Sequence, residues 1–231
     1  MAEKKVLLIL RLEGALQSWG EMSKWDFRDS ADFPSKSGIV GLIGCAMGIE
    51  RESPELAALS DAMTVAVRAD RPGIRFTDFQ TVTGDPLRTA EGKPRRTAEG
   101  KPSYTFISNR VYLQDACFTV FIETEEAWRD RIVSGLMEPK WCMYLGRKNC
   151  VPSRPVLECA NPDYDGLDDA LRNYPTAGRA EYPMQYETER EDPSLSSFTR
   201  SDLVQEGYRS FSNRRVWRGI VKEGAYVPVA D

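Results

Sequence analysis

Histidine is absent from all 231 residues of the sequence. Imidazole is the commonest general base in enzymes and the commonest metal ligand in proteins. Its absence excludes the serine and cysteine triads that depend on histidine, and it removes the residue that usually completes a cysteine-based zinc site. Chemistry in this chain would have to use tyrosine, lysine, aspartate, glutamate or cysteine.

Cysteine pairs are also lacking. The five cysteines are odd in number and form no CxxC pair, and they are Cys45, Cys117, Cys142, Cys150 and Cys159. This pattern predicts neither a zinc site nor a disulfide framework, so we expect reduced and mostly buried thiols. Cys150 follows two cations, which can lower the pKa of a thiol and make it nucleophilic, but no base or second cysteine stands nearby in the sequence.

Long apolar runs are missing as well. The run VLLIL at residues 6–10 follows two lysines, but it is far too short to span a bilayer and no small-residue cleavage site follows it. We therefore expect a cytoplasmic protein without a membrane partner. The 41% of hydrophobic residues can build a sizeable core, in one large domain or in one domain with an appendage.

The net charge of −4 argues against a nucleic-acid-binding protein, but the charges are unevenly distributed. Residues 161–206 hold eleven acidic and four basic side chains, a local charge of −7. Residues 88–102 hold five basic and two acidic side chains, and residues 208–222 hold five basic side chains and no acidic one. Such segregation suits a protein that presents one face to an anion and another face to something else.

Hydrophobic periodicity and turn residues predict strands and helices in alternation. The predicted elements are a strand at 6–12, a helix from Ser37 with Ser35 or Ser37 as its N-cap, a helix at 54–61, a strand at 64–69, a long excursion at 73–110 read as a two-stranded arm, a strand at 116–122, a helix capped by Thr124 and a strand at 156–159. This order is the ferredoxin-like β-α-β-β-α-β pattern. The sequence therefore predicts an α+β fold, with a ferredoxin-like domain over residues 1–160 and an appended, partly irregular region over 161–231.

Two stretches could bind phosphate. In FPSKSGIVG, a helix start with Lys36 and two serines could hold an anion through free backbone donors, although a capped core helix explains the same residues and the Walker spacing is missing. Four glycines at 38, 41, 44 and 48 suggest that this helix approaches a sheet or a ligand closely. In YLGRKNCVPSRP, a flexible glycine beside two cations suits backbone phosphates, and an ordinary solvated turn is the alternative.

Weaker patterns remain open. Basic and aromatic residues interleave in YRSFSNRRVWRG and SNRVYL, which suits stacking on single-stranded bases but equally suits a half-buried sheet face. The paired acids Asp168-Asp169 and Glu191-Asp192 lie in the acidic region, where a solvated face is the simpler reading than a metal site.

Five ordered motifs carry a family resemblance: LRLEGALQSWG, FPSKSGIVGLIGCAMGI, DFQTV, YLQDACFTV and YLGRKNCVPSRPV. In order and spacing they resemble the Cas-five family, subtype e, of the RAMP superfamily of CRISPR RNA-binding proteins. Members of that family are subunits of the type I-E CRISPR surveillance complex, Cascade. The resemblance covers most of residues 6–158 and returns weakly at FSNRRVW.

The resemblance implies a ferredoxin-like (RRM-like, RAMP) domain with a β-hairpin thumb at about residues 74–112. It implies a non-catalytic subunit of antiviral defence without metal or cofactor, which holds the 5′ handle of the crRNA at one end of the complex and caps the backbone filament. The implied neighbours are the backbone subunit CasC and the large subunit CasA, and target DNA is met only through the complex. The implied RNA-binding residues are Gln17, Ser18, Trp19, Lys36, Ser37, Gly38, Gln80, Thr81, Arg110, Tyr112, Gly146, Arg147 and Lys148.

Two alternatives stay open. Relatives in another subtype cleave the repeat RNA themselves with residues that include a histidine, so a metal-independent endoribonuclease would here need tyrosine and lysine in its place. A subunit that only bridges proteins also fits the net charge of −4. If the handle-binding reading holds, we expect reversal of the charges of Arg147 and Lys148 to weaken assembly on crRNA and to leave the isolated fold intact.

The stretch RTAEGKPRRTAEGKP, residues 88–102, is a tandem repeat of an octad inside the implied thumb. In an extended arm an even period would place equivalent residues of the two copies on the same face. Duplications are also tolerated best at exposed loop tips, and GKP favours turns. We therefore expect a duplicated, mobile thumb tip with electrostatic rather than specific RNA contact.

Overall fold

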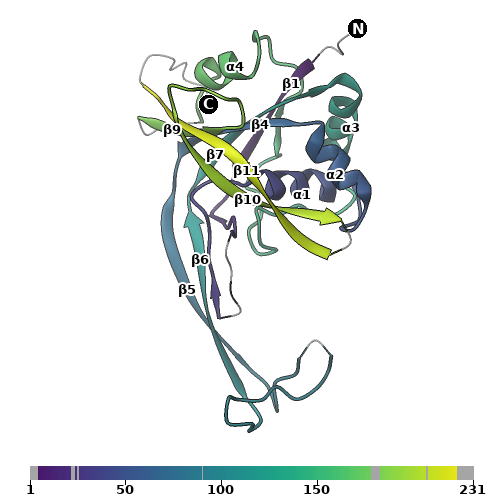
Figure 1. Ribbon diagram of the computed structural model, residues 1–231, viewed down its shortest axis with the longest axis vertical. Helices are drawn as coiled ribbons and strands as arrows, with labels where there is room; N and C mark the ends of the chain where they lie inside the picture. The colour runs from purple at the N-terminus through teal and green to yellow at the C-terminus, as the bar shows by residue number, and fades with distance from the viewer. Residues whose placement is uncertain are drawn as a thin grey trace.

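The computed structural model describes residues 5–21, 24, 26–89, 91–177, 183–206 and 208–222, and between 202 and 211 it describes the backbone alone. A seven-stranded sheet forms the centre of the protein (Figure 1). In order across the sheet its strands are β10 (Ser196–Glu206), β11 (Tyr208–Val221), β9 (Met184–Thr188), β4 (Thr64–Arg71), β7 (Cys117–Glu125), β1 (Lys5–Glu13) and β8 (Leu157–Cys159). All neighbouring strands are antiparallel.

In the part of the chain that the structure describes, four helices cover the two faces of this sheet. They are α1 (Lys36–Met47), α2 (Pro54–Asp61), α3 (Glu126–Met137) and α4 (Leu167–Asn173). The chain passes through α1 and α2 between β1 and β4, and through α3 between β7 and β8. Each of these connections skips one strand of the sheet, so β7 lies between β1 and β4, and β1 lies between β7 and β8. Within the described residues, no helix is both long and apolar enough to cross a membrane.

Strand β1 shows why the sheet is buried on both faces. Its side chains alternate, so Leu8 and Leu10 join the core beneath α1, α2 and α3, whereas Leu7 and Ile9 join the core beneath α4. Both faces of β1 therefore exclude water. This explains the nearly continuous apolar run that predicted a buried strand at residues 6–12.

Serine side chains cap the starts of α1 and α2, whereas α3 and α4 begin without a side-chain cap. Ser35 Oγ accepts a hydrogen bond from the Gly38 N–H at 3.1 Å, which confirms Ser35 as the N-cap of α1. The prediction that Thr124 caps α3 is wrong, because Thr124 Oγ1 donates to the Ala62 carbonyl at 2.9 Å and Glu125 takes the N-cap position. Tertiary contact with the end of α2 here competes successfully with local capping.

The glycines of α1 have separate causes. A Cβ on Gly38 would lie 3.1 Å from the Trp19 ring, so this position does allow a close approach. Gly48 ends the helix with a φ of +72°, as helix-terminating glycines often do. Gly41 has nothing within 4 Å of its built Cβ, so the expectation of close approach is wrong there.

The region beyond residue 160 adds α4 and three strands, of which β9 pairs directly with β4. Where the sequence suggested partly irregular structure, β10 and β11 pair over eleven registered positions. Arg68, fully buried on β4, fastens this region by donating to the carbonyls of Leu171, Tyr174 and Pro175 at 2.9, 2.9 and 3.1 Å. Residues 223–231, the last part of the expected appendage, lie outside the described residues.

A long arm projects from the main sheet, as the excursion at residues 73–110 predicted (Figure 1). Its stalk is the antiparallel pair β5 (Ile74–Thr83) and β6 (Thr105–Gln114), and its tip is residues 84–104. Two short strands brace the base of β6 on its other edge: β2 (Leu16–Gln17) antiparallel and β3 (Phe27–Arg28) parallel. The base of the arm is therefore a small second sheet.

Candidate nucleic-acid interface

Four cationic residues come together from distant parts of the sequence at the base of the arm. Arg28 on β3 lies in register with Arg110 on β6, which lies in register with Asp78 on β5. Arg147, from the turn after α3, reaches the backbone of β3 at Arg28, and Lys148 follows it. We call Arg28, Arg110, Arg147 and Lys148 the cationic patch.

Arg147 is held in a fixed position. Its guanidinium lies over the Tyr112 ring, 4.6 Å from the centroid, and its Nη2 donates to the carbonyls of Arg28 and Asp29 at 2.9 and 3.1 Å. Its Nη1 is buried and has no hydrogen-bond partner in the described part of the chain. Arg147 therefore joins the turn to β3 and β6.

Lys148 is exposed and forms no ion pair with any residue that the structure describes. Next to it, Asn149 Nδ2 donates to the Tyr112 hydroxyl at 3.1 Å. The turn is thus anchored on both sides of Lys148 while Lys148 itself points its charge to solvent. Among the four cations, it is the one best placed to meet an anion without first breaking an internal contact.

Gly146 lets this turn sit against the protein. Its φ is +91°, and a Cβ on it would lie 1.7 Å from the Ser18 carbonyl oxygen, so no larger residue fits. Ser18 is buried, its N–H donates to the Leu145 carbonyl at 3.0 Å and its hydroxyl donates to the Val111 carbonyl at 3.1 Å. Ser18 therefore links the cationic turn to β6.

Gln17 and Trp19 support the same region from inside the protein. The Gln17 amide donates to the carbonyls of Leu12 and Ala116 at 2.9 and 2.8 Å and accepts from Trp19 Nε1 at 3.1 Å. Gln17 is fully buried and Trp19 is 2% exposed. The family resemblance implied RNA contacts for Gln17, Ser18 and Trp19, and in the structure the side chains of all three have internal hydrogen-bond partners.

The start of α1 is also engaged internally. Lys36 Nζ donates to the Met63 carbonyl at 2.8 Å and lies 3.1 Å from a Glu189 carboxylate oxygen. The hydroxyls of Ser35 and Ser37 lie 3.2 Å apart, and the Gly38 N–H is satisfied by Ser35. Lys36 therefore neutralises an acid of the C-terminal region, and the capped-helix reading of FPSKSGIVG accounts for these contacts.

The remaining predicted residues lie on the arm and do not share one face. Gln80, Arg110 and Tyr112 lie on the same face of the β5–β6 pair, because Gln80 is in register with Ser108, two residues before Arg110. Thr81 lies on the opposite face and is exposed. Gln80 Nε2 donates to an Asp78 carboxylate at 2.6 Å, and Tyr112 is 1% exposed beneath Arg147.

Comparison with known proteins identifies the family. The family described as CRISPR-associated protein (Cas_Cas5) matches residues 7–225. The chain belongs to the Cas5 family. It is 33% identical over 187 residues to the CRISPR system Cascade subunit CasD of Escherichia coli (strain K12). The aligned region covers 74% of this chain and 78% of that protein. The family resemblance carried by the five sequence motifs is thus confirmed.

Solved structures agree with this assignment. A chain of a CRISPR RNA-guided surveillance complex matches with a TM-score of 0.75 and 29% identity, over 94% of this chain and 90% of that one. A structure described as a crystal structure of a Cas protein matches with a TM-score of 0.66 and 29% identity, over 95% of this chain and 99% of that one. The mixed α/β architecture of the Cas5 chain is therefore shared along nearly its whole length.

The thiols of this Cas5 family member are unpaired, and the one beside the cationic turn, Cys150, is buried. All five cysteines are free: Cys117 and Cys150 are buried, Cys142 is exposed, and Cys45 and Cys159 are intermediate. Burial raises the pKa of Cys150, and the nearby Arg147 only partly opposes this. In the part of the chain that the structure describes, no three acidic or cysteine side chains are grouped to hold a metal ion.

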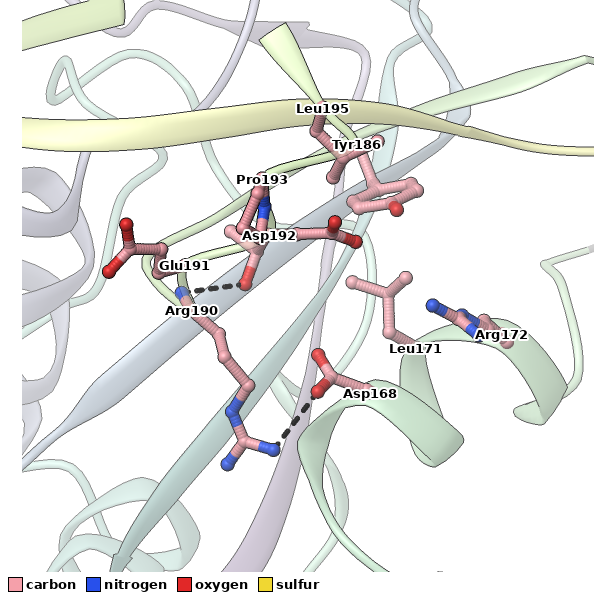
Figure 2. A pocket seen from close by; sticks show the side chains of 10 residues that line it. Asp168, Leu171, Arg172, Tyr186, Arg190, Glu191, Asp192, Pro193 and Leu195 are labelled. Carbon is pink, nitrogen blue, oxygen red and sulfur yellow. Dashed lines mark hydrogen bonds and ion pairs between the residues drawn. The ribbon is translucent and has the colours of Figure 1, made fainter. Parts of the chain in front are cut away.

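A pocket of about 130 Å³ lies between α4 and the turn from β9 to β10, at the end of the molecule opposite the arm tip (Figures 1 and 2). It contains Asp168 and Asp192 from the paired acids noted in the sequence. Of its two cations, Arg190 is paired with Asp168 and Glu123, each at 3.0 Å, and so holds α4 against the sheet. The Asp192 carboxylate instead accepts hydrogen bonds from the Ser194 N–H and hydroxyl.

Sequence reasoning missed Arg28 and Asn149. Arg28 reaches the cationic patch because β3 pairs in parallel with β6, 82 residues later in the sequence. Asn149 positions the turn through the Tyr112 hydroxyl. Neither contact has a local sequence pattern, since both depend on segments that only the tertiary fold brings together.

Proposed function

We propose that this chain is a non-catalytic subunit of a Cascade-type CRISPR surveillance complex and that its cationic patch holds the 5′ handle of the crRNA. The observation that carries the proposal is the convergence of Arg28, Arg110, Arg147 and Lys148 at the base of the arm. Arginine donors and an exposed lysine are the groups that bind backbone phosphates. Membership of the Cas5 family and the likeness to a surveillance-complex chain support RNA as the ligand.

The arm supports a role within a larger assembly. Phe79 and Ile107 are 63% and 47% exposed on one face of the stalk, and Phe27 on β3, 46% exposed, lies in the same row of the sheet as Phe79. A two-stranded arm with exposed large apolar side chains needs to be covered. We infer that the backbone subunit CasC and the large subunit CasA are the neighbours, with this chain capping the filament and meeting target DNA only through the complex.

We also infer that β4, β7, β1 and β8, with α1, α2 and α3, form the ferredoxin-like RAMP domain, within residues 1–160. The antiparallel order and the two strand-skipping helical connections support this assignment. The described residues between 161 and 222 then belong to the appended region beside it, and the arm corresponds to the thumb. Assembly on crRNA would place the protein in the cytoplasm.

Charge reversal on the exposed side of the patch tests the handle-binding role. Arg110→Glu with Lys148→Glu should weaken binding of handle-bearing RNA at least about tenfold, because each lost phosphate contact on a single strand is worth about fivefold at 0.1 M salt. The affinity is measured by fluorescence anisotropy, and the crRNA that co-purifies with the assembled complex is quantified. Lys222→Glu, an exposed cation at the end of β11, is the matched control. Equal RNA retention by the double variant and the control would contradict the proposal.

The endoribonuclease alternative finds little support in the geometry. Tyr112, the tyrosine beneath the Arg147 guanidinium, is 1% exposed. Incubating the purified chain with its cognate repeat RNA in EDTA separates the two functions. Specific cleavage under those conditions would overturn the non-catalytic assignment.

A further inference from the structure

The tip of the arm is built from the duplicated octad, and in the residues that the structure describes the two copies form the same hydrogen bonds. We call residues 88–94 and 96–102 the two leaves. In each leaf a threonine N–H donates to a lysine carbonyl at 2.8 Å, and a glycine with φ near +78° donates back to the threonine carbonyl at 2.9 Å. The residues are Thr89, Gly92 and Lys93 in the first leaf and Thr97, Gly100 and Lys101 in the second. The second octad therefore repeats a complete local structure.

Three backbone hydrogen bonds join the leaves to the stalk in a ring. The Leu87 N–H donates to the Ser103 carbonyl at 2.9 Å, the Arg95 N–H to the Leu87 carbonyl at 2.6 Å, and the Ser103 N–H to the Arg95 carbonyl at 2.8 Å. The stalk and the two leaves therefore meet at a single junction that these three hydrogen bonds hold together. Removing one leaf would let Leu87 and Ser103 satisfy each other, as in an ordinary hairpin.

The charged side chains also occupy equivalent positions in the two leaves. Each leaf contains an internal ion pair, Glu91 with Lys93 at 3.1 Å and Glu99 with Lys101 at 3.2 Å. One arginine per leaf then remains without a carboxylate partner in the described part of the chain. These are Arg88 and Arg96, and a third such arginine, Arg95, lies at the centre over the Phe106 ring at 4.0 Å.

The two leaf arginines are held in equivalent orientations. Arg88 Nη1 donates to the Gly92 carbonyl at 2.8 Å, and Arg96 Nη1 donates to the Gly100 carbonyl at 2.6 Å. Each bond fixes one end of an exposed guanidinium and leaves its other donors directed to solvent. A fixed guanidinium fork matches the oxygens of a phosphate.

We propose that the two leaves are equivalent and independent contacts for the phosphodiester backbone of a single-stranded nucleic acid. A repeated site suits a ligand that is itself a repeating polyanion. The leaves contain no aromatic or large aliphatic side chain, so they offer neither base stacking nor the apolar anchor of a protein interface. The inference deepens the proposed RNA-binding function, in that it adds a sequence-independent contact at the tip to the handle contact at the base.

The equivalence of the leaves gives the test. The probe is a labelled oligouridylate without any handle sequence, bound to the full chain at several salt concentrations. Arg88→Gln and Arg96→Gln should each weaken binding by the same factor, about fivefold at 0.1 M salt, and each should lower the salt slope by about 0.7. Deleting residues 88–95, which leaves one intact leaf, should give a folded protein that still responds to loss of its remaining leaf arginine.

A paired control separates charge from folding. Glu91→Gln with Lys93→Gln removes an ion pair without changing the net charge, and it should bind the probe as the parent chain does. Unequal effects of the two arginine substitutions would overturn the equivalence, and loss of affinity without a change in salt slope would overturn the phosphate assignment. Unchanged affinity in both variants would show that the tip does not bind the strand.

The same probe distinguishes this inference from the handle-binding proposal. Lys148→Glu should abolish the preference for handle-bearing RNA over oligouridylate while leaving the effect of Arg88→Gln intact. If the tip variants bind the probe like the parent chain while Lys148→Glu loses the handle preference, the leaf sites are refuted and the proposal for the base of the arm stands. If Lys148→Glu keeps the handle preference while the tip variants bind more weakly, the handle-binding proposal is refuted and the leaf sites stand.

Discussion

Arg147 and Lys148 are adjacent cations, yet the structure predicts that their replacement has different consequences. Arg147→Ala removes two hydrogen bonds to backbone carbonyls, at 2.9 and 3.1 Å, and a cation–π contact with Tyr112. Each hydrogen bond is worth about 1 kcal/mol net when water can replace it, and the cation–π contact adds about 0.5–1 kcal/mol. The total of about 2–3 kcal/mol should lower the melting temperature by about 5–10 °C in a chain of this size. Lys148→Ala should change stability by less than about 0.5 kcal/mol, because Lys148 is exposed and unpaired in the described part of the chain.

Thermal and urea unfolding followed by circular dichroism measures this difference. RNA affinity is then compared at a temperature where both variants are folded, and both should bind handle-bearing RNA more weakly than the parent. Equal melting temperatures for the two variants would refute the assignment of Arg147 as the residue that joins the turn to β3 and β6. The expectation from sequence, that both cations can be reversed without harm to the fold, is thereby restricted to Lys148.

Two further predictions concern the glycines and the thiols. Gly146→Ala should destabilise the protein by about 2–5 kcal/mol, because it adds left-handed backbone strain and a clash with the Ser18 carbonyl. In the same unfolding assay, Gly41→Ala should stabilise the protein by up to about 1 kcal/mol, because open space surrounds that helical position. A destabilised Gly41→Ala variant or a tolerant Gly146 would contradict these assignments. Iodoacetamide at pH 8 should alkylate the exposed Cys142 first. Burial raises the pKa of Cys117 to about 12, so this thiol stays protonated and out of contact with the reagent. If peptide mass spectrometry finds Cys117 labelled as fast as Cys142, the core is more open than described.

Local patterns predicted most of the elements but few of the side-chain roles. The helix predicted at 54–61 has those bounds in the structure, and the arm lies at the excursion predicted over residues 73–110. The predicted cap at Thr124 was wrong because its hydroxyl reaches Ala62, 62 residues earlier in the chain. Strand pairing and hydrogen bonding to a distant backbone cannot be read from spacing.

The same is true of the candidate site, where the sequence located the segments but not the role of each side chain. Motif resemblance indicated the loop around Ser18, the turn at Gly146 and the strand bearing Arg110, and the structure brings these three segments together at the base of the arm. The resemblance could not distinguish the residues that face solvent from those that hold the interface in place. Lysine is a residue type that binds phosphate, but the charge of Lys36 is neutralised by the carboxylate of Glu189, 153 residues later in the chain.

The sequence by itself determined the family, the order of the main strands and helices within residues 1–160, the absence of imidazole chemistry and the existence of a duplicated basic segment. These properties depend on residue identity, on order and on short-range spacing. Only the tertiary structure decided that β10 and β11 extend the main sheet, that Arg147 is held internally while Lys148 is exposed and has no ion-pair partner among the described residues, and that the duplicated octads close into two equivalent leaves. The physical reason is that burial and hydrogen-bond partners are set by contacts between residues far apart in the chain, which the fold alone brings within reach.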